Sequence, residues 1–138
     1  MPSIQRVAVI SGMIFILVGL LGFSTMGMAG MSMGAASVML LGLFPVNMLH
    51  NLVHMLFGVW GVIAGRNAKA SATYALGSGA AYLLLGIVGL FTDRLLGMVP
   101  IGGYDVVLHL LLAVLLAGFG FWSMWFAPQR QPVRASRA

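Results

Sequence analysis

Four ionisable side chains stand at helical spacing inside apolar stretches of this sequence. His50 and His54 are four residues apart, and so are Asp105 and His109. Residues four apart share one face of a helix, so each pair would present two polar groups to the same neighbour. Imidazole and carboxylate groups can form hydrogen bonds, relay protons or hold a divalent metal ion. We therefore look for the chemistry of this chain at these two pairs.

The two pairs belong to two versions of one segment, FPVNMLHNLVHML and VPIGGYDVVLHLL. At a constant offset of 55 residues, the alignment pairs Pro45 with Pro100, His50 with Asp105 and His54 with His109. A glycine-spaced apolar run lies upstream of each version, ILVGLLGF in the first half and LLLGIVGL in the second. The pattern predicts an internal duplication in which each half forms a helix, a loop, a proline and a second helix.

The composition is that of an integral membrane protein, with 61% hydrophobic and 7% charged residues. A spanning helix needs about 20 mostly apolar residues, and the sequence contains segments that meet or approach this length at 7–23, 47–64, 71–91 and 105–126. We predict an all-α membrane protein. Residues 1–127 would form a bundle of four transmembrane helices, made of two duplicated helix pairs in parallel repeats, and residues 128–138 a short basic tail.

The basic residues predict the orientation of the chain, because they favour the cytoplasmic side of a membrane. One side of the predicted bundle carries Arg6, Arg66, Lys69, Arg130, Arg134 and Arg137, and the other carries Arg94. This asymmetry places the N- and C-termini in the cytoplasm of a multi-pass protein of the bacterial inner membrane. Scattered basic residues beside spans indicate orientation rather than binding to nucleic acid. The expected partner is the lipid bilayer.

If Pro45 and Pro100 mark helix starts, the two pairs lie at similar depth below the outer surface and face one another. Three interpretations remain open. The cluster could be a hydrogen-bonded network, in which Asp105 pairs with an imidazole and Asn47 or Asn51 caps backbone N–H groups. It could be a site for a divalent ion such as zinc, with the ligands His50, His54, Asp105 and His109. It could also bind haem b through His54 and His109 as axial ligands.

A second, weaker candidate site lies in the loop after the first span. Met26, Met28, Met31 and Met33 offer thioethers, which are soft ligands that select Cu(I). Methionine also serves as adaptable packing material. The apolar stretch from residue 35 to 44 is predicted to be a short helix on the outer rim of the bundle.

Signatures of catalysis are missing from the sequence. It contains no GxSxG, HExxH or Walker motif. It has two carboxylate side chains, Asp93 and Asp105, and Asp93 is predicted to lie in an exposed loop. The chain has no cysteine, which excludes thiolate metal sites and iron–sulfur clusters. We therefore expect a protein that is not an enzyme.

Two motifs, Pro-Val-Asn-x-x-His-Asn-x-x-His from Pro45 and Pro-x-x-x-x-Asp-x-x-x-His from Pro100, resemble the pattern of the DUF4383 family of small bacterial four-span membrane proteins. The resemblance covers nearly the whole chain. It implies a four-helix integral membrane fold and no assigned activity. The signature residues that it implies are Asn47, His50, Asn51, His54, Asp105 and His109.

The leading hypothesis for function is a non-enzymatic membrane protein whose Asn/His/Asp cluster organises the bundle and holds a divalent metal ion, haem or no cofactor. One alternative is an accessory subunit of a larger respiratory or photosynthetic complex, since glycine-rich helices with short loops can pack against other membrane proteins or copies of the same chain. Another is a small transporter.

Overall fold

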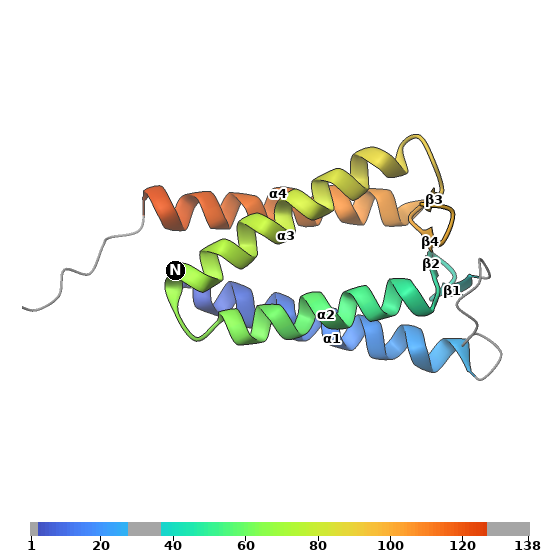
Figure 1. Ribbon diagram of the computed structural model, residues 1–138, viewed down its shortest axis with the longest axis horizontal. Coiled ribbons are helices and arrows are strands. Elements are labelled where there is room, and N and C mark those ends of the chain that lie inside the picture. The colour runs from blue at the N-terminus through green and yellow to red at the C-terminus, as the bar shows by residue number, and fades with distance from the viewer. Residues whose placement is uncertain (1–2, 28–36, 127–138) are drawn as a thin grey trace, which may run out of the picture.

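The computed structural model of the chain describes residues 3–27 and 37–126 (Figure 1). Its helices are α1 (Ile4–Met26), α2 (Met48–Ala64), α3 (Ala68–Gly89) and α4 (Tyr104–Trp125). Its strands are β1 (Val38–Leu40), β2 (Phe44–Val46), β3 (Arg94–Leu95) and β4 (Val99–Pro100). The predicted helical architecture is confirmed, and two small β-hairpins accompany it that the sequence did not predict.

Three of the helices have the length and composition of membrane spans. They are α1 with 23 residues and α3 and α4 with 22 residues each. Helix α2 is apolar but has only 17 residues, which corresponds to about 26 Å at about 1.5 Å per residue. Among the described residues, three helices are therefore long and apolar enough to cross a membrane, and the second predicted span is shorter than the others.

The helices pack as two antiparallel pairs, α1 with α2 and α3 with α4 (Figure 1). Glycines allow the backbones within each pair to touch, because a Cβ atom on Gly58 would lie 2.8 Å from the carbonyl oxygen of Gly12. In the second pair, a Cβ atom on Gly79 would lie 2.7 Å from the backbone nitrogen of Ala117. Close backbone approach increases van der Waals contact where lipid supplies no hydrophobic force between helices.

The core between the two pairs contains mostly small and aromatic side chains from all four helices, together with one leucine: Ala8, Phe15, Ala64, Tyr74, Tyr82, Ala113 and Leu116. Two serine hydroxyls of these helices bond to backbone carbonyls. The Ser11 hydroxyl donates to the Val7 carbonyl at 2.7 Å, and the Ser71 hydroxyl donates to the Ala64 carbonyl at 2.9 Å. The large aliphatic side chains point outward instead, as expected for a protein surrounded by lipid.

Both hairpins turn at a Leu-Gly pair with positive φ. In β1–β2 these residues are Leu41 and Gly42, with φ of 54° and 71°, and in β3–β4 they are Leu96 and Gly97, with φ of 52° and 73°. A hydrogen bond closes each turn, from Leu43 N to Leu40 O at 3.1 Å and from Met98 N to Leu95 O at 3.0 Å. The two turns are 55 residues apart, the same offset that relates the histidine segments.

Two local predictions are wrong. Pro45 and Pro100 do not begin helices: they lie in strands β2 and β4, and the helices begin at Met48 and Tyr104. Within the predicted rim helix, residues 38–40 and 44 belong to hairpin strands. The physical reason is the turn, since consecutive residues with positive φ reverse the chain and bring Met39 opposite Pro45. A short two-stranded hairpin also tolerates a proline, which donates no ladder hydrogen bond.

Adding one methyl group should separate the helices of the first pair. We expect Gly58→Ala to destabilise the protein by about 1 to 3 kcal/mol, because the new Cβ overlaps the backbone of α1. The matched control is Gly118→Ala on α4, where a Cβ meets no atom of residues 3–27 and 37–126 within 4 Å and helix propensity favours alanine by up to about 1 kcal/mol. Thermal unfolding in mild detergent measures both. Equal unfolding midpoints for the two variants would contradict the close α1–α2 contact.

Candidate functional site

The candidate site lies where α2 and α4 begin, at the hairpin end of the molecule. Helix α2 begins because Asn47 caps it: the Asn47 side chain accepts a hydrogen bond from the backbone N–H of His50 at 2.9 Å. His50 and His54 follow in the first two turns of α2, and Asp105 and His109 occupy the same turns of α4. All four side chains are buried. The two helix starts therefore bring four ionisable groups inside the protein at one level.

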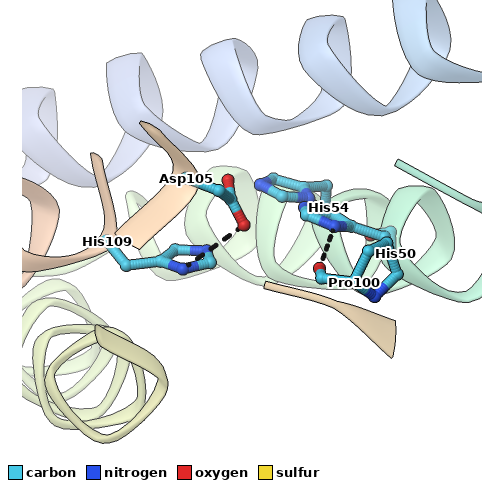
Figure 2. Close-up of polar contacts among 5 residues, drawn as sticks. All are labelled: His50, His54, Pro100, Asp105 and His109. Carbon is cyan, nitrogen blue, oxygen red and sulfur yellow. Dashed lines mark hydrogen bonds and ion pairs between the residues drawn. The ribbon is translucent and has the colours of Figure 1, made fainter. Parts of the chain in front are cut away.

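Three of these groups converge from both helix pairs (Figure 2). One potential ligand atom from each of His50, Asp105 and His109 lies within 4.8 Å of the other two. These residues are 4%, 2% and 2% exposed, respectively. The structure therefore joins the two segments through a compact group of two imidazoles and one carboxylate, shielded from solvent.

Asp105 and His109 approach each other without forming a hydrogen bond. Oδ2 of Asp105 and Nδ1 of His109 are 3.6 Å apart, and neither atom has a hydrogen-bond partner among the described residues. Buried polar atoms without partners are costly, and each calls for an explanation such as a bound ion or water. Oδ2 of Asp105 and Nδ1 of His109 therefore remain available as ligand atoms, close to each other.

His50 is held in an orientation that leaves one ring nitrogen available. Its Nδ1 lies 3.0 Å from the carbonyl oxygen of Pro100, and because a carbonyl can only accept, Nδ1 must carry the proton. In a neutral imidazole Nε2 then keeps its lone pair. Histidines that bind metals commonly donate their other ring N–H to a backbone carbonyl in this way. His54 is oriented similarly, by a 3.1 Å contact from its Nδ1 to the carbonyl oxygen of His50.

His54 lies beside this group and does not belong to it. Its ring stacks on that of His50, with centroids 4.7 Å apart, and meets the edge of Phe15 at 5.8 Å. A porphyrin bound axially by His54 and His109 would have to lie between them. The ring of His50 lies 4.7 Å from that of His54 and 6.3 Å from that of His109, and Phe15 and Tyr82 pack against the same two imidazoles. A porphyrin bound by this pair would have to displace some of these rings.

The two asparagines have different roles. Besides capping α2, Asn47 donates through Nδ2 to the Met98 carbonyl at 2.7 Å and so connects α2 to the second hairpin. Asn51 does not cap a helix: its Nδ2 donates to the sulfur of Met26 at 2.9 Å. The thioether of Met26 thus contacts an amide. Met28, Met31 and Met33 lie outside the described residues.

Sequence reasoning missed several groups that contact the site. The ring of Tyr82 stacks on His109 at 5.2 Å, and the carbonyl of Pro100 orients His50. Tyr82 had a detectable signal, because Tyr74, Ser78 and Tyr82 follow one another at intervals of four residues and place polar groups on one face of an apolar helix. The Pro100 carbonyl had none, since every residue carries such a group and only the fold selects this one.

Comparison with known proteins places the chain in a family. The profile of a domain of unknown function, DUF4383, matches residues 5–122. The chain belongs to the DUF4383 family. The match includes all the described residues of the site and agrees with the resemblance seen in the sequence motifs. No curated protein and no solved structure matches the chain. The function of this DUF4383 protein must therefore be inferred from its site.

The contact from Asn47 to the second hairpin can be separated from its helix cap. We expect Asn47→Ala to destabilise this DUF4383 protein by about 2 to 3 kcal/mol, because it removes a cap and leaves the Met98 carbonyl without its donor. Asn67→Ala is the matched control. Asn67 caps α3 by accepting from the Ala70 N–H at 2.8 Å, so its loss should cost about 1 kcal/mol.

Asn47→Asp adds to this test, because it keeps the capping oxygen but replaces the donor to Met98 by a carboxylate oxygen, which carries negative charge and cannot donate. Chemical unfolding in mild detergent measures all three variants. If Asn47→Ala and Asn67→Ala were equally stable, the contact between the two halves would contribute nothing.

Proposed function

We propose that this protein is a non-enzymatic integral membrane protein that binds one divalent transition-metal ion between its two helix pairs. The ligands are His50, Asp105 and His109. The observation that carries the proposal is the buried pair of Asp105 Oδ2 and His109 Nδ1, which lie 3.6 Å apart beside His50 and have no hydrogen-bond partner in the part of the chain that the structure describes.

The distances support an ion of the size and ligand preference of zinc. Nitrogen and oxygen ligands lie about 2.1 Å from zinc, so two ligands of a tetrahedral site are about 3.4 Å apart. The 3.6 Å separation of the Asp105 and His109 atoms is close to this spacing. The three ligand atoms lie within 4.8 Å of one another, so the widest separation exceeds the tetrahedral spacing by about 1.4 Å at most. Imidazole and carboxylate suit zinc and similar borderline ions.

The burial of the ligands favours binding over catalysis. Each is at most 4% exposed, so a substrate could not reach an ion held among them without local opening. The ion would instead connect α2 of the first pair to α4 of the second. We propose that its role is to hold the hairpin ends of the two pairs together, where a carboxylate and two imidazoles would otherwise share a dry interior.

We also propose that the two halves arose by duplication and that both termini face the cytoplasm of a bacterium. Matching hairpin turns and matching histidine segments at an offset of 55 residues support the duplication. The positions of Arg66 and Lys69 at the α2–α3 turn, opposite the hairpins, support the orientation. The metal site then lies toward the outer face of the inner membrane.

Metal analysis of the wild-type protein and of single-residue variants tests the binding site. We expect the detergent-purified protein, loaded with Zn(II) and dialysed, to keep one ion per chain. Asp105→Asn should lower the affinity for zinc at least tenfold, because it removes the anionic ligand. Asp93→Asn is the matched control, since Asp93 is the other carboxylate of the chain and is exposed. His54→Ala should keep the ion, because His54 lies outside the ligand group.

Replacement of zinc by Co(II) gives a second readout, visible absorption bands that report nitrogen and oxygen coordination. Wild-type protein that loses its metal on dialysis, or an Asp105→Asn variant that binds zinc as tightly as Asp93→Asn, would refute the site. A Soret band in the purified protein would indicate haem in place of the ion.

A further inference from the structure

The first hairpin has a surface unlike that of a loop in water. Every side chain in VMLLGLFPV, from Val38 to Val46, is apolar. Leu41 at its tip is 77% exposed, and Leu96 at the tip of the second hairpin is 83% exposed. Both hairpins therefore have an exposed leucine in the turn.

The hairpins lie at the depth of the helix ends and do not project far beyond them. Strand β1 contacts α1, and Figure 1 shows both hairpins beside the ends of the helices. Helix α1 has 23 residues, or about 34 Å, and α2 has 17, or about 26 Å, against a hydrocarbon core of about 30 Å. Met26, the last residue of α1, contacts Asn51 in the first turn of α2, so the start of α2 and the first hairpin lie level with the end of α1.

The turns themselves are unfavourable for leucine. Tight turns with two consecutive positive φ angles favour asparagine followed by glycine, because a leucine Cβ is strained in this region. Here Leu41 and Leu96 adopt φ of 54° and 52°. Transfer of each leucine side chain from water into an apolar medium is favourable, and this gain would offset the backbone strain at both tips.

We propose that the tips of both hairpins insert into the membrane leaflet at their end of the molecule, with Leu41 and Leu96 in contact with phospholipid acyl chains. The inference requires that the helices cross a bilayer and is independent of metal binding. The sequence Thr92, Asp93 and Arg94 precedes the second tip and marks its polar boundary at the headgroups. The hairpins thereby cover the His50 and Asp105 cluster with lipid-immersed protein.

The absence of cysteine from the chain permits a direct test. Single variants Leu41→Cys and Leu96→Cys are labelled with a nitroxide, and the protein is reconstituted in vesicles of phosphatidylcholine and phosphatidylglycerol. Electron paramagnetic resonance then compares collisions with oxygen, which concentrates in lipid, and with a nickel chelate, which stays in water. Val114→Cys, 72% exposed in the middle of α4, is the lipid-facing reference. Lys69→Cys, exposed at the opposite end, is the aqueous reference.

We expect labels at 41 and 96 to behave like the label at 114, with strong oxygen collisions and nickel collisions several-fold weaker than at 69. Nickel collisions equal to those at 69 would place the tips in water and overturn the proposal. Weak collisions with both reagents would mean that protein covers the tips, either a second copy or another chain, and would overturn it as well. If the Leu41→Cys variant fails to fold, Met39→Cys, 53% exposed in β1, reports on the same hairpin.

Discussion

The structure depends on burying polar and ionisable groups where two apolar helix pairs meet. A carboxylate and imidazoles inside a membrane protein cannot rely on water, so each must find a partner within the protein or in an ion that it binds. Backbone carbonyls at the ends of the second hairpin supply two of these partners, Pro100 for His50 and Met98 for Asn47. These contacts cross from one half of the chain to the other. The polar cluster is therefore also the main polar connection between the halves at this end.

Glycine contacts hold the helices together within each pair, and aromatic and polar contacts connect the two pairs. Within each pair the backbones touch, as at Gly12 with Gly58 and Gly79 with Ala117. Between the pairs, aromatic rings such as Tyr82 and Phe15 fill the space and pack against His109 and His54. Rings packed on both sides restrict the imidazoles to a few orientations. For the proposed metal site, this restriction would limit the reorganisation that binding requires.

The hairpins limit where α2 begins and satisfy part of their own backbone hydrogen bonding. Helix α2 cannot start earlier, because the chain reverses at Leu41 and Gly42 and enters a strand that contains Pro45. Each hairpin closes its own turn with a backbone hydrogen bond, which satisfies part of its main chain within a largely apolar surrounding. In the second hairpin, the carbonyls of Pro100 and Met98 also accept hydrogen bonds from His50 and Asn47. The first hairpin thus limits where α2 begins, and the second hairpin orients His50.

The sequence by itself determined the helical class of the described part of the chain, the approximate places of its helices and the residues with chemical capacity. These features follow from local quantities: apolar length, the spacing of His50 and His54, and the spacing of Asp105 and His109. The offset of 55 residues also pointed to equivalent places in the two halves. None of these local signals depends on how the helices pack.

Only the tertiary structure decided which groups meet. It brought His50 together with Asp105 and His109, left His54 to one side, and assigned Asn47 to the cap and Asn51 to Met26. It also replaced helix starts at Pro45 and Pro100 by hairpin strands, through leucines with positive φ that no propensity would predict. The physical reason is that partners such as the Pro100 carbonyl are main-chain atoms present at every position, and only packing selects among them.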